Sequence, residues 1–196
     1  MVKEDSEAWD KYPHHRSIFN KLDLALKLGY NAGPCGVSVP VEGKYIVRPI
    51  YNLSGMGMGA SVQTLTPGEP IPPGYFWCEY FEGDQYTIDY VWNGCWDPVF
   101  AAEGVRGANL IEFICWRKID PPQIALPDWL DQYHDAKTIN IEMIGSKIIE
   151  VHLRHGSDFP KGAKEIVPIW SDMKYVENYE DADGLMSNPR KGFYYR

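Results

Sequence analysis

Two glutamates lie in a stretch that otherwise consists largely of isoleucine, valine and other apolar residues. Residues 139–153 form two short apolar runs separated at 145–146 by Gly-Ser, a pattern typical of a β-hairpin. A three-residue loop or a bulge would place Glu142 directly opposite Glu150, with Cβ atoms ~5 Å apart. A tight two-residue turn would instead pair Glu150 with Ile141 and turn Glu142 to the other face. The sequence leaves both registers open.

The second run carries further polar side chains beyond its glutamate. Strand alternation places Glu150, His152 and Arg154 on one side, and Glu142 faces them in the opposed register. Two carboxylates this close repel each other unless a cation lies between them. Carboxylates bind hard cations, and arginine forms paired hydrogen bonds to phosphoryl or carboxylate oxygens. These residues therefore indicate a site for Mg²⁺ and phosphate, and the alternative is a solvent-facing polar stripe on an amphipathic strand.

Composition and charge limit the classes of function. The chain has 196 residues, 44% of them hydrophobic, which is enough for one well-buried core or for two small lobes that share a cleft. A net charge of −8 argues against nucleic acid as the main partner, because a nucleic-acid footprint is basic. The four cysteines have no C-x-x-C spacing, which favours reduced thiols over a zinc site or disulfides. We expect neither a signal peptide nor a membrane span, so the predicted location is cytoplasmic.

The pattern of apolar runs, glycines and prolines predicts an α+β fold, mostly antiparallel sheet with one or two helices packed on a face. Residues 1–14 are interpreted as a loose arm, and Ser17 is the expected N-cap of a helix over 18–28 that has Leu26 on its apolar face. Residues 64–73 are interpreted as a linker. The other expected elements are a brief helix over 128–133 and strands or extended segments over 36–40, 44–50, 75–81, 85–92, 95–102, 109–118, 139–144, 147–153 and 165–170.

Four stretches, in this order along the chain, resemble motifs of the ATP-grasp superfamily, which includes D-alanine–D-alanine ligase, biotin carboxylase and carbamoyl phosphate synthetase. Residues 45–49 (YIVRP) are similar to the family's V-V-K-P strand. Residues 54–59 (SGMGMG) are similar to its glycine-rich loop, and residues 79–87 (EYFEGDQYT) to its E-x-I-x-G-x-E-x-T element. Residues 141–154 resemble the hairpin that ends in E-V-N-x-R. A glycine-rich loop alone is weak evidence, so the order of the set matters more than any one member.

The chain departs from these motifs at three positions. Arg48 stands where the family has lysine, and it still supports phosphate binding as a planar fork. His152 replaces an asparagine, so an imidazole, a softer ligand for Mg²⁺, takes the place of an amide. Gln85 replaces the acid that usually binds the ribose. We also expect the chain to lack the domain that normally precedes the family's core, and that domain often helps to bind the acceptor.

The resemblance implies an ATP- and Mg²⁺-dependent ligase that activates a carboxylate as an acyl phosphate for attack by an amine or a similar nucleophile. It implies metal ligation by Glu142, Glu150 and His152, and catalytic roles for Arg48, Arg154 and His152. The residues implied for nucleotide binding are Arg48, Ser54, Gly55, Gly57, Gly59, Cys78, Glu79, Tyr80, Phe81 and Gln85.

The resemblance also implies an organisation into two small lobes with the nucleotide cleft between them. Residues 15–72 would form the N-terminal subdomain with the glycine-rich loop, and residues 73–196 the C-terminal subdomain with the metal-binding hairpin and an irregular tail. The acceptor would be a small molecule or a peptide, and a homodimer or a partner protein would supply the missing lobe. Two alternatives stay open: a degenerate domain that binds a nucleotide or a protein without catalysis, and a structural or interaction protein with an accidental resemblance.

Overall fold

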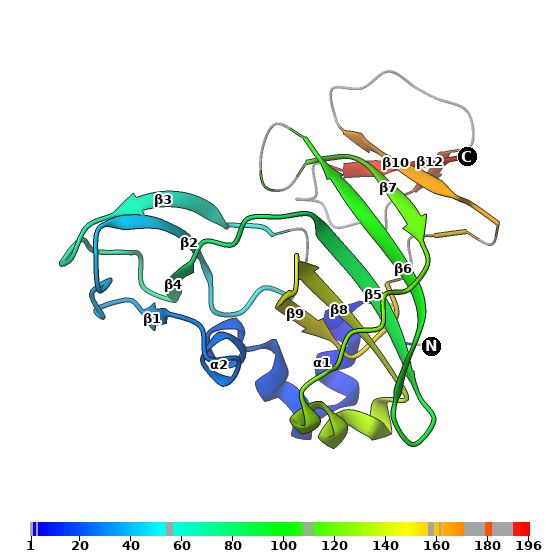
Figure 1. Cartoon of the computed structure of the whole chain (residues 1–196), viewed down its shortest axis with the longest axis horizontal. Coiled ribbons are helices and arrows are strands. Elements are labelled where there is room, and N and C mark those ends of the chain that lie inside the picture. The colour runs from blue at the N-terminus through cyan, green and yellow to red at the C-terminus, as the bar shows by residue number, and fades with distance from the viewer. Residues whose placement is uncertain are drawn as a thin grey trace.

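The chain folds into two antiparallel sheets accompanied by short helices (Figure 1), which confirms the predicted α+β class. The computed structural model describes residues 2, 4–53, 57–107, 110, 112–156, 159–160, 162–170, 179–181 and 190–196. The helices it describes are α1 (Asp5–Lys11), the 3₁₀ helix η1 (Pro13–Phe19), α2 (Lys21–Lys27) and the 3₁₀ helix η2 (Asp128–Ala136).

The smaller sheet comes from the first part of the chain and has four strands. Their order across the sheet is β1 (Ala32–Pro34), β4 (Tyr75–Glu79), β2 (Gly43–Pro49) and β3 (Ser61–Leu65). A small apolar cluster that includes Val47, Leu65 and Trp77 packs on it. Residues 64–73, interpreted from the sequence as a linker, thus begin inside a strand, and the predicted segment 36–40 is replaced by β1.

The larger sheet has eight described strands and forms most of the rest of the molecule. Their order is β11 (Tyr179–Asp181), β12 (Arg190–Tyr195), β10 (Glu165–Trp170), β7 (Phe113–Ile119), β6 (Trp96–Arg106), β5 (Gln85–Trp92), β8 (Thr138–Ile144) and β9 (Lys147–His152). The predicted strands 85–92 and 165–170 are confirmed to the residue.

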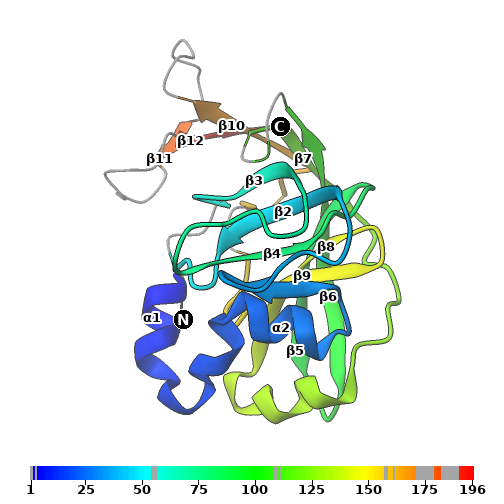
Figure 2. The same cartoon turned by 90° about the vertical axis from the view of Figure 1, so that its left-hand side faces the viewer.

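The main core lies on one face of β5, β8 and β9. Ile88, Ile141 and Val151 are aligned across these three strands and are all buried. Helical side chains that include Ala8, Leu24, Leu130 and Tyr133 complete this core. Figure 2 shows α1 and α2 gathered at one side of the molecule, next to this part of the sheet. Because strand side chains alternate between faces, the neighbouring positions on the same strands are free to carry polar groups.

The hairpin of β8 and β9 combines a tight turn with a bulge. Ile144 pairs with Lys147 across a two-residue turn, but the register shifts by one residue before Glu142 and Glu150, which pair directly. The extra residue is Ile149, and a single inserted residue is the defining feature of a β-bulge. The opposed register of the two glutamates, one of the two alternatives left open by the sequence, is therefore the one that the protein adopts.

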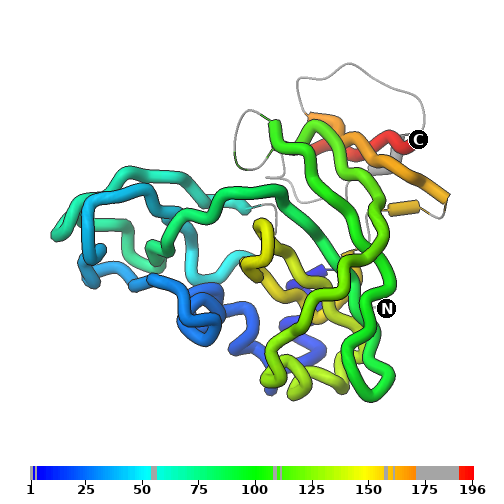
Figure 3. The backbone as a smooth tube through the Cα atoms, in the orientation of Figure 1, coloured from blue at the N-terminus to red at the C-terminus, as the bar shows by residue number. Residues whose placement is uncertain are grey.

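The interpretation of residues 1–14 as a loose arm is wrong. Residues Asp5–Lys11 form α1, in which Asp5 and Ala8 are buried, and η1 begins at Pro13. Figure 3 shows this N-terminal segment, in blue, running beside the hairpin of β8 and β9, in yellow. A helix of seven residues has little stability by itself, so its contacts with the sheet determine its structure.

The helix predicted over 18–28 is split at Asn20. The Asn20 side chain accepts a hydrogen bond from the Asp23 backbone N–H and caps α2, whereas Ser17 lies within η1. The later start rotates the buried face of the helix. Lys21 is consequently buried, and Leu26, expected on the apolar face, is exposed.

The predicted strands 75–81 and 85–92 belong to different sheets. The first corresponds to β4, which pairs with β1 and β2, and the second to β5, which pairs with β6 and β8. The smaller sheet therefore extends to Glu79, past the predicted division at 72/73. Residues 80–84 connect the two sheets.

No helix in the described part of the chain combines the length and the apolar character that crossing a lipid bilayer requires.

The buried row of Ile88, Ile141 and Val151 should contribute strongly to the free energy of unfolding. Ile141 is 0% exposed, so Ile141→Ala should lower the free energy of unfolding by about 2–5 kcal/mol. Ile114→Ala is the matched control, because Ile114 is also a strand residue but is 60% exposed; its cost should stay below about 1 kcal/mol. Urea unfolding followed by tryptophan fluorescence measures both, and equal losses would contradict the placement of the core.

Candidate functional site

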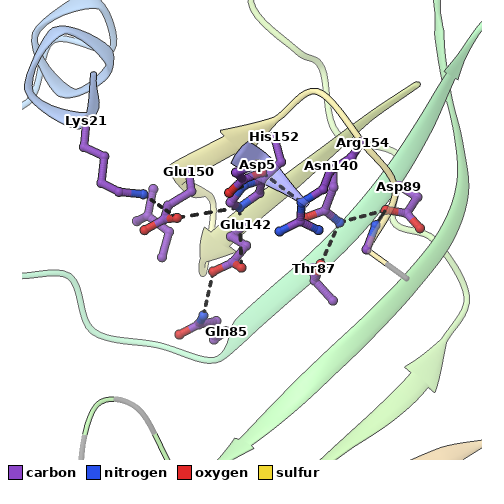
Figure 4. A network of polar contacts seen from close by, with 12 residues as sticks. Asp5, Lys21, Gln85, Thr87, Asp89, Asn140, Glu142, Glu150, His152 and Arg154 are labelled. Atoms are coloured by element: carbon purple, nitrogen blue, oxygen red, sulfur yellow. Dashed lines mark hydrogen bonds and ion pairs between the residues drawn. The ribbon is translucent and has the colours of Figure 1, made fainter. Parts of the chain in front are cut away.

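A polar face lies opposite the apolar row of the large sheet. The register places Thr87, Glu142 and Glu150 in one row across β5, β8 and β9. The next row contains Asp89, Asn140 and His152. Figure 4 shows these side chains gathered on one side of the strands. Strand alternation predicts this grouping for the hairpin residues. The neighbouring strand β5 contributes Thr87 and Asp89 to the same face.

Glu150 is buried and is held by two cations. Lys21 Nζ lies 2.5 Å from one carboxylate oxygen, and Arg48 Nη1 donates to the other at 3.1 Å. Arg48 Nη2 also donates to the backbone oxygen of Ile149 at 2.9 Å, so the bulge residue supplies a second acceptor. Burial alone would raise the pKa of Glu150, but Lys21 and Arg48, together with His152, lower it to about 2. Glu150 is therefore a fixed negative charge at neutral pH.

Lys21 is a site residue that the sequence analysis missed. It occupies the first turn of α2, on the same buried face as Leu24 and Ala25. Positions 21, 24 and 25 follow the i, i+3, i+4 spacing of a buried helix face, and a lysine at such a position indicates a buried partner. That spacing was the available signal, but the start of the helix had to be placed correctly to use it.

His152 lies at the centre of the cluster and is almost fully buried. Its Nδ1 lies 2.8 Å from Asp5 Oδ2. Its Nε2 lies 3.7 Å from Glu142 Oε1 and 3.6 Å from Glu150 Oε2, and it has no hydrogen-bond partner at closer range. Burial lowers the pKa of His152, but the charge of Asp5 opposes this and the pKa is raised to about 9. The imidazole is therefore protonated at neutral pH, and Nε2–H points between the two glutamates.

Asp5 connects the N-terminal helix to the end of the hairpin. Its two carboxylate oxygens accept hydrogen bonds from His152 Nδ1 and from Arg154 Nε, each at 2.8 Å. Burial would raise the pKa of Asp5, but His152 and Arg154 keep it well below its usual range. The sequence analysis missed Asp5 because it placed the residue in a loose arm. Its buried contacts also fix the position of Arg154.

Glu142 is the more accessible of the paired acids, with 30% of its side chain exposed. It accepts a hydrogen bond from Gln85 Nε2 at 3.2 Å, and Gln85 Oε1 accepts one from Arg106 Nη2 at 2.8 Å. Gln85, which the resemblance assigns to nucleotide binding, is thus next to the acidic pair. Arg106 reaches the polar face of the sheet through this amide, a role that the sequence alone did not indicate.

A second polar chain fixes the backbone after β9. Asn140 Nδ2 donates to Thr87 Oγ1 at 2.7 Å and to Asp89 Oδ1 at 2.8 Å, and the Gly156 backbone N–H donates to the same Asp89 oxygen at 2.7 Å. Burial raises the pKa of Asp89, and these hydrogen bonds oppose the shift. The contacts hold residues 154–156 against the sheet, so Arg154 is anchored from both sides.

The three predicted metal ligands lie together but do not fit a magnesium ion in this arrangement. Both oxygens of Glu150 bind cationic side chains, and the raised pKa of His152 favours a proton on the Nε2 atom, where a ligand would need a lone pair. Among the described residues, the ligand atoms that gather within 4.8 Å of one another belong to other side chains, those of His14, His15 and Asp135. The His152 ring lies between the two carboxylates, with Nε2 at 3.7 Å from Glu142 Oε1 and 3.6 Å from Glu150 Oε2.

Four consecutive residues that the resemblance assigns to nucleotide binding, 78–81, lie around the connection between the sheets. Cys78 is buried in β4, and the Glu79 backbone N–H donates to Asn31 O at 2.8 Å. The Glu79 side chain accepts from the Asn31 backbone N–H at 3.0 Å, so both groups take part in holding β1 and β4 together. The Tyr80 ring lies 4.5 Å from Lys44 Nζ, and the Phe81 ring packs on Tyr30.

The predicted glycine-rich loop is described only in part. Gly57 and Gly59 have φ values of 60° and 79°, in the region that favours glycine. A Cβ atom at Gly59 would lie 2.9 Å from the Tyr75 hydroxyl and 3.0 Å from Pro49, so the backbone passes close to the end of β2. Ser54 and Gly55 lie outside the described residues.

The buried ion pairs predict a distinct pH dependence. A raised pKa for His152 means that its contribution to stability is complete below its ordinary pKa of 6.5 and is lost as the pH rises through about 9. Asp5→Asn removes the main cause of the shift, so it should lower the pKa of His152 and flatten the decline of stability between pH 6.5 and 9. Because it removes the carboxylate that pairs with the buried Arg154 guanidinium and with His152 Nδ1, it should also cost about 3–5 kcal/mol at pH 7.

Imidazole NMR and urea unfolding across this pH range measure both effects. His134→Gln is the control, because His134 is exposed and should leave the pH profile unchanged. Titration of wild-type His152 near 6.5 would contradict the buried ion pair.

Comparison with known proteins gives likenesses in structure alone. No protein-family model and no curated protein sequence matches the chain. One similar solved structure is that of a protein described as ATP-grasp from Archaeoglobus fulgidus, with 13% sequence identity and a TM-score of 0.48. A second is an L-amino acid ligase from Bacillus licheniformis, with 11% identity and a TM-score of 0.45. A third is a carboxyaminoimidazole ribonucleotide synthase from Aspergillus clavatus complexed with ATP, with 12% identity and a TM-score of 0.48. The matches cover 91%, 72% and 79% of this chain, and it spans 63%, 42% and 52% of theirs. Similarity at this level concerns the fold alone.

Proposed function

We propose that the protein binds ATP where the small sheet meets the β8–β9 hairpin, and that it uses ATP to activate a carboxylate for ligation to an amine. The observation that carries the proposal is the convergence of Lys21 and Arg48 on Glu150, with Arg154 held nearby by Asp5. Lys21 comes from α2, Arg48 from β2 and Arg154 from the segment after β9. The four ATP-grasp-like motifs of the sequence support the same assignment.

The charge of the cluster suits a polyanionic ligand. Lys21, Arg48, Arg154 and protonated His152 are four cationic groups, and they face the three carboxylates Asp5, Glu142 and Glu150. The cations are largely shielded from water, and shielding strengthens their attraction for phosphate oxygens.

Lys21 and Arg48 are placed to exchange the Glu150 carboxylate for the phosphate oxygens of a ligand. Lys21 and Arg48 both bind Glu150, and phosphate oxygens are acceptors of the same kind as its carboxylate. His152 Nε2–H has no hydrogen-bond acceptor at close range, so a phosphoryl oxygen near Glu142 would complete its contacts. Gly57 and Gly59, beside the end of β2, would bring backbone N–H groups towards the phosphates.

In the proposed reaction an oxygen of the substrate carboxylate attacks the γ-phosphorus of ATP, and ADP leaves. The amine then attacks the acyl carbon and phosphate leaves, while the amine loses a proton. The protein's part in such chemistry is to position the reactants and to neutralise developing charge. Arg48 and Lys21 would neutralise the transferred phosphoryl group, and Arg154, fixed by Asp5, would face the acyl phosphate. No step is assigned to a metal ion, because the predicted ligands do not fit one as arranged.

Nucleotide binding without catalysis is the second candidate function. The position of His152 favours it, because an imidazolium between Glu142 and Glu150 occupies the space that a metal ion would need. The two candidates share the binding site and differ in whether ADP is released.

ATP binding should raise the melting temperature through Lys21. With ATP at about 100 times its dissociation constant the native state gains about 2.7 kcal/mol, which thermal unfolding detects easily. Lys21→Met should abolish most of the shift. Lys27→Met is the matched control, since Lys27 lies on the same helix but is paired with Asp23 at the surface. Each variant is compared with and without ATP, so a loss of basal stability does not affect the result. The binding site would be refuted by equal shifts in both variants, or by no shift in the wild type.

ADP release should separate ligation from binding alone. Incubation with ATP, a panel of carboxylates and amines, and Mg²⁺ should yield ADP only when both acceptors are present. Arg48→Met should reduce the rate by at least about 10²-fold, because a charge-neutralising group is lost. Arg117→Met is the control, as Arg117 pairs with Glu165 at the surface. ATP binding without ADP release across the panel would support the second candidate and contradict the first.

A further inference from the structure

A second cluster of ligating side chains joins η1 to η2. His14 and His15 are adjacent on η1, and Asp135 lies in the last turn of η2, 120 residues further along the chain. His14 Nε2 lies 3.0 Å from one oxygen of Asp135, and His15 Nε2 lies 2.6 Å from the other. No residue of the proposed ATP site takes part in the cluster.

We propose that His14, His15 and Asp135 bind a divalent transition-metal ion of the Zn²⁺ class. The ligand atoms of the three side chains all lie within 4.8 Å of one another. Two imidazoles and one carboxylate are a common protein donor set for Zn²⁺ and related ions, with metal–ligand bonds of about 2.0–2.2 Å. Such bonds place neighbouring ligand atoms about 3.3–3.6 Å apart in a tetrahedral site. The observed contacts therefore need only a small outward movement.

The exposure of the three side chains allows that movement. The His14 and Asp135 side chains are 59% and 41% exposed, whereas His15 is 11% exposed and is packed edge-on against the Tyr133 ring. One ligand is thus fixed by the core, and the other two adjust from the surface. Solvent remains available for the fourth coordination position, which a water molecule would take.

The charge distribution also favours a divalent cation. The two imidazole rings lie close together, with centroids 4.0 Å apart and ring planes inclined at 51° to each other. Two neutral imidazoles and one carboxylate carry a single negative charge, which a divalent ion compensates. Arg16, a nearby cation on η1, is occupied elsewhere, since it stacks on the Trp9 ring and donates to the Trp9 backbone oxygen.

Metal binding would join the N-terminal segment to the segment that precedes β8. Both helices contribute to the main core, η1 through Ile18 and Phe19 and η2 through Leu130 and Tyr133. An ion that binds only when these helices are in place stabilises the native state. Because the cluster is separate from Lys21 and Arg48, this proposal does not depend on the proposed ATP-dependent function.

The test uses the full chain without a histidine tag. CoCl₂ should give visible d–d absorption bands that report nitrogen and oxygen ligation, and ZnCl₂ should displace them at one equivalent. ZnCl₂ should also raise the melting temperature, while MgCl₂, which prefers all-oxygen sites, should have no effect at this cluster. Calorimetry with ZnCl₂ supplies the dissociation constant.

The matched variants are His14→Ala and His134→Ala. Both histidines are exposed, but His134 contacts the Asp131 backbone oxygen and is not part of the cluster. His14→Ala should weaken Zn²⁺ binding at least about tenfold and remove the melting-temperature rise, and His134→Ala should bind as the wild type does. Asp135→Asn should likewise weaken binding. Absence of cobalt bands in the wild type, or equal Zn²⁺ affinity in wild type and His14→Ala, would overturn the proposal.

Discussion

The buried carboxylate of Glu150 is the constraint on which the arrangement of this protein depends. A charge out of water is costly unless it is compensated by opposite charge and hydrogen bonds. Compensation here comes from Lys21 on α2 and Arg48 on β2, two elements that are distant in sequence from β9. Removing any one of the three would leave an uncompensated charge. The ion pairs thus fix where the small sheet and α2 lie relative to the hairpin, and they do so with directional contacts that apolar packing does not provide.

The same principle extends along β9 to the N-terminal helix. His152 and Arg154 are both largely buried cations, and Asp5 is their shared partner. A helix as short as α1 gains little from its own hydrogen bonds, so the burial of Ala8 and the ion pairs of Asp5 determine its structure. Charged side chains at alternate positions of β9 and just after it therefore hold three other segments, α1, α2 and β2, in place. Each of these segments contributes a side chain to the candidate site.

Sequence patterns predicted the hairpin, the strands β5 and β10 and the shared face of Glu150 and His152, because each depends on local alternation. They could not select the register of Glu142 and Glu150. The bulge at Ile149 is supported by a hydrogen bond from Arg48, a residue 101 positions earlier, and local spacing contains no information about such a contact. Lys21 and Asp5 were missed for a related reason. Both look like surface charges unless the partner that buries them is known.

The ion pairs also give a physical account of the histidine that stands where the resembling family has asparagine. In the proposed function a triphosphate takes Lys21 and Arg48 as its partners, and Glu150 then loses most of its compensating charge. The nearest remaining cationic group is the His152 imidazolium, 3.6 Å from Glu150 and 3.7 Å from Glu142. A neutral amide in this position would leave the repulsion between the two opposed carboxylates uncompensated. An imidazolium, which Asp5 holds in place, offsets that repulsion with its positive charge. The residue that makes this site a poor fit for a metal ion is thus the residue whose cationic ring lies between the two opposed carboxylates.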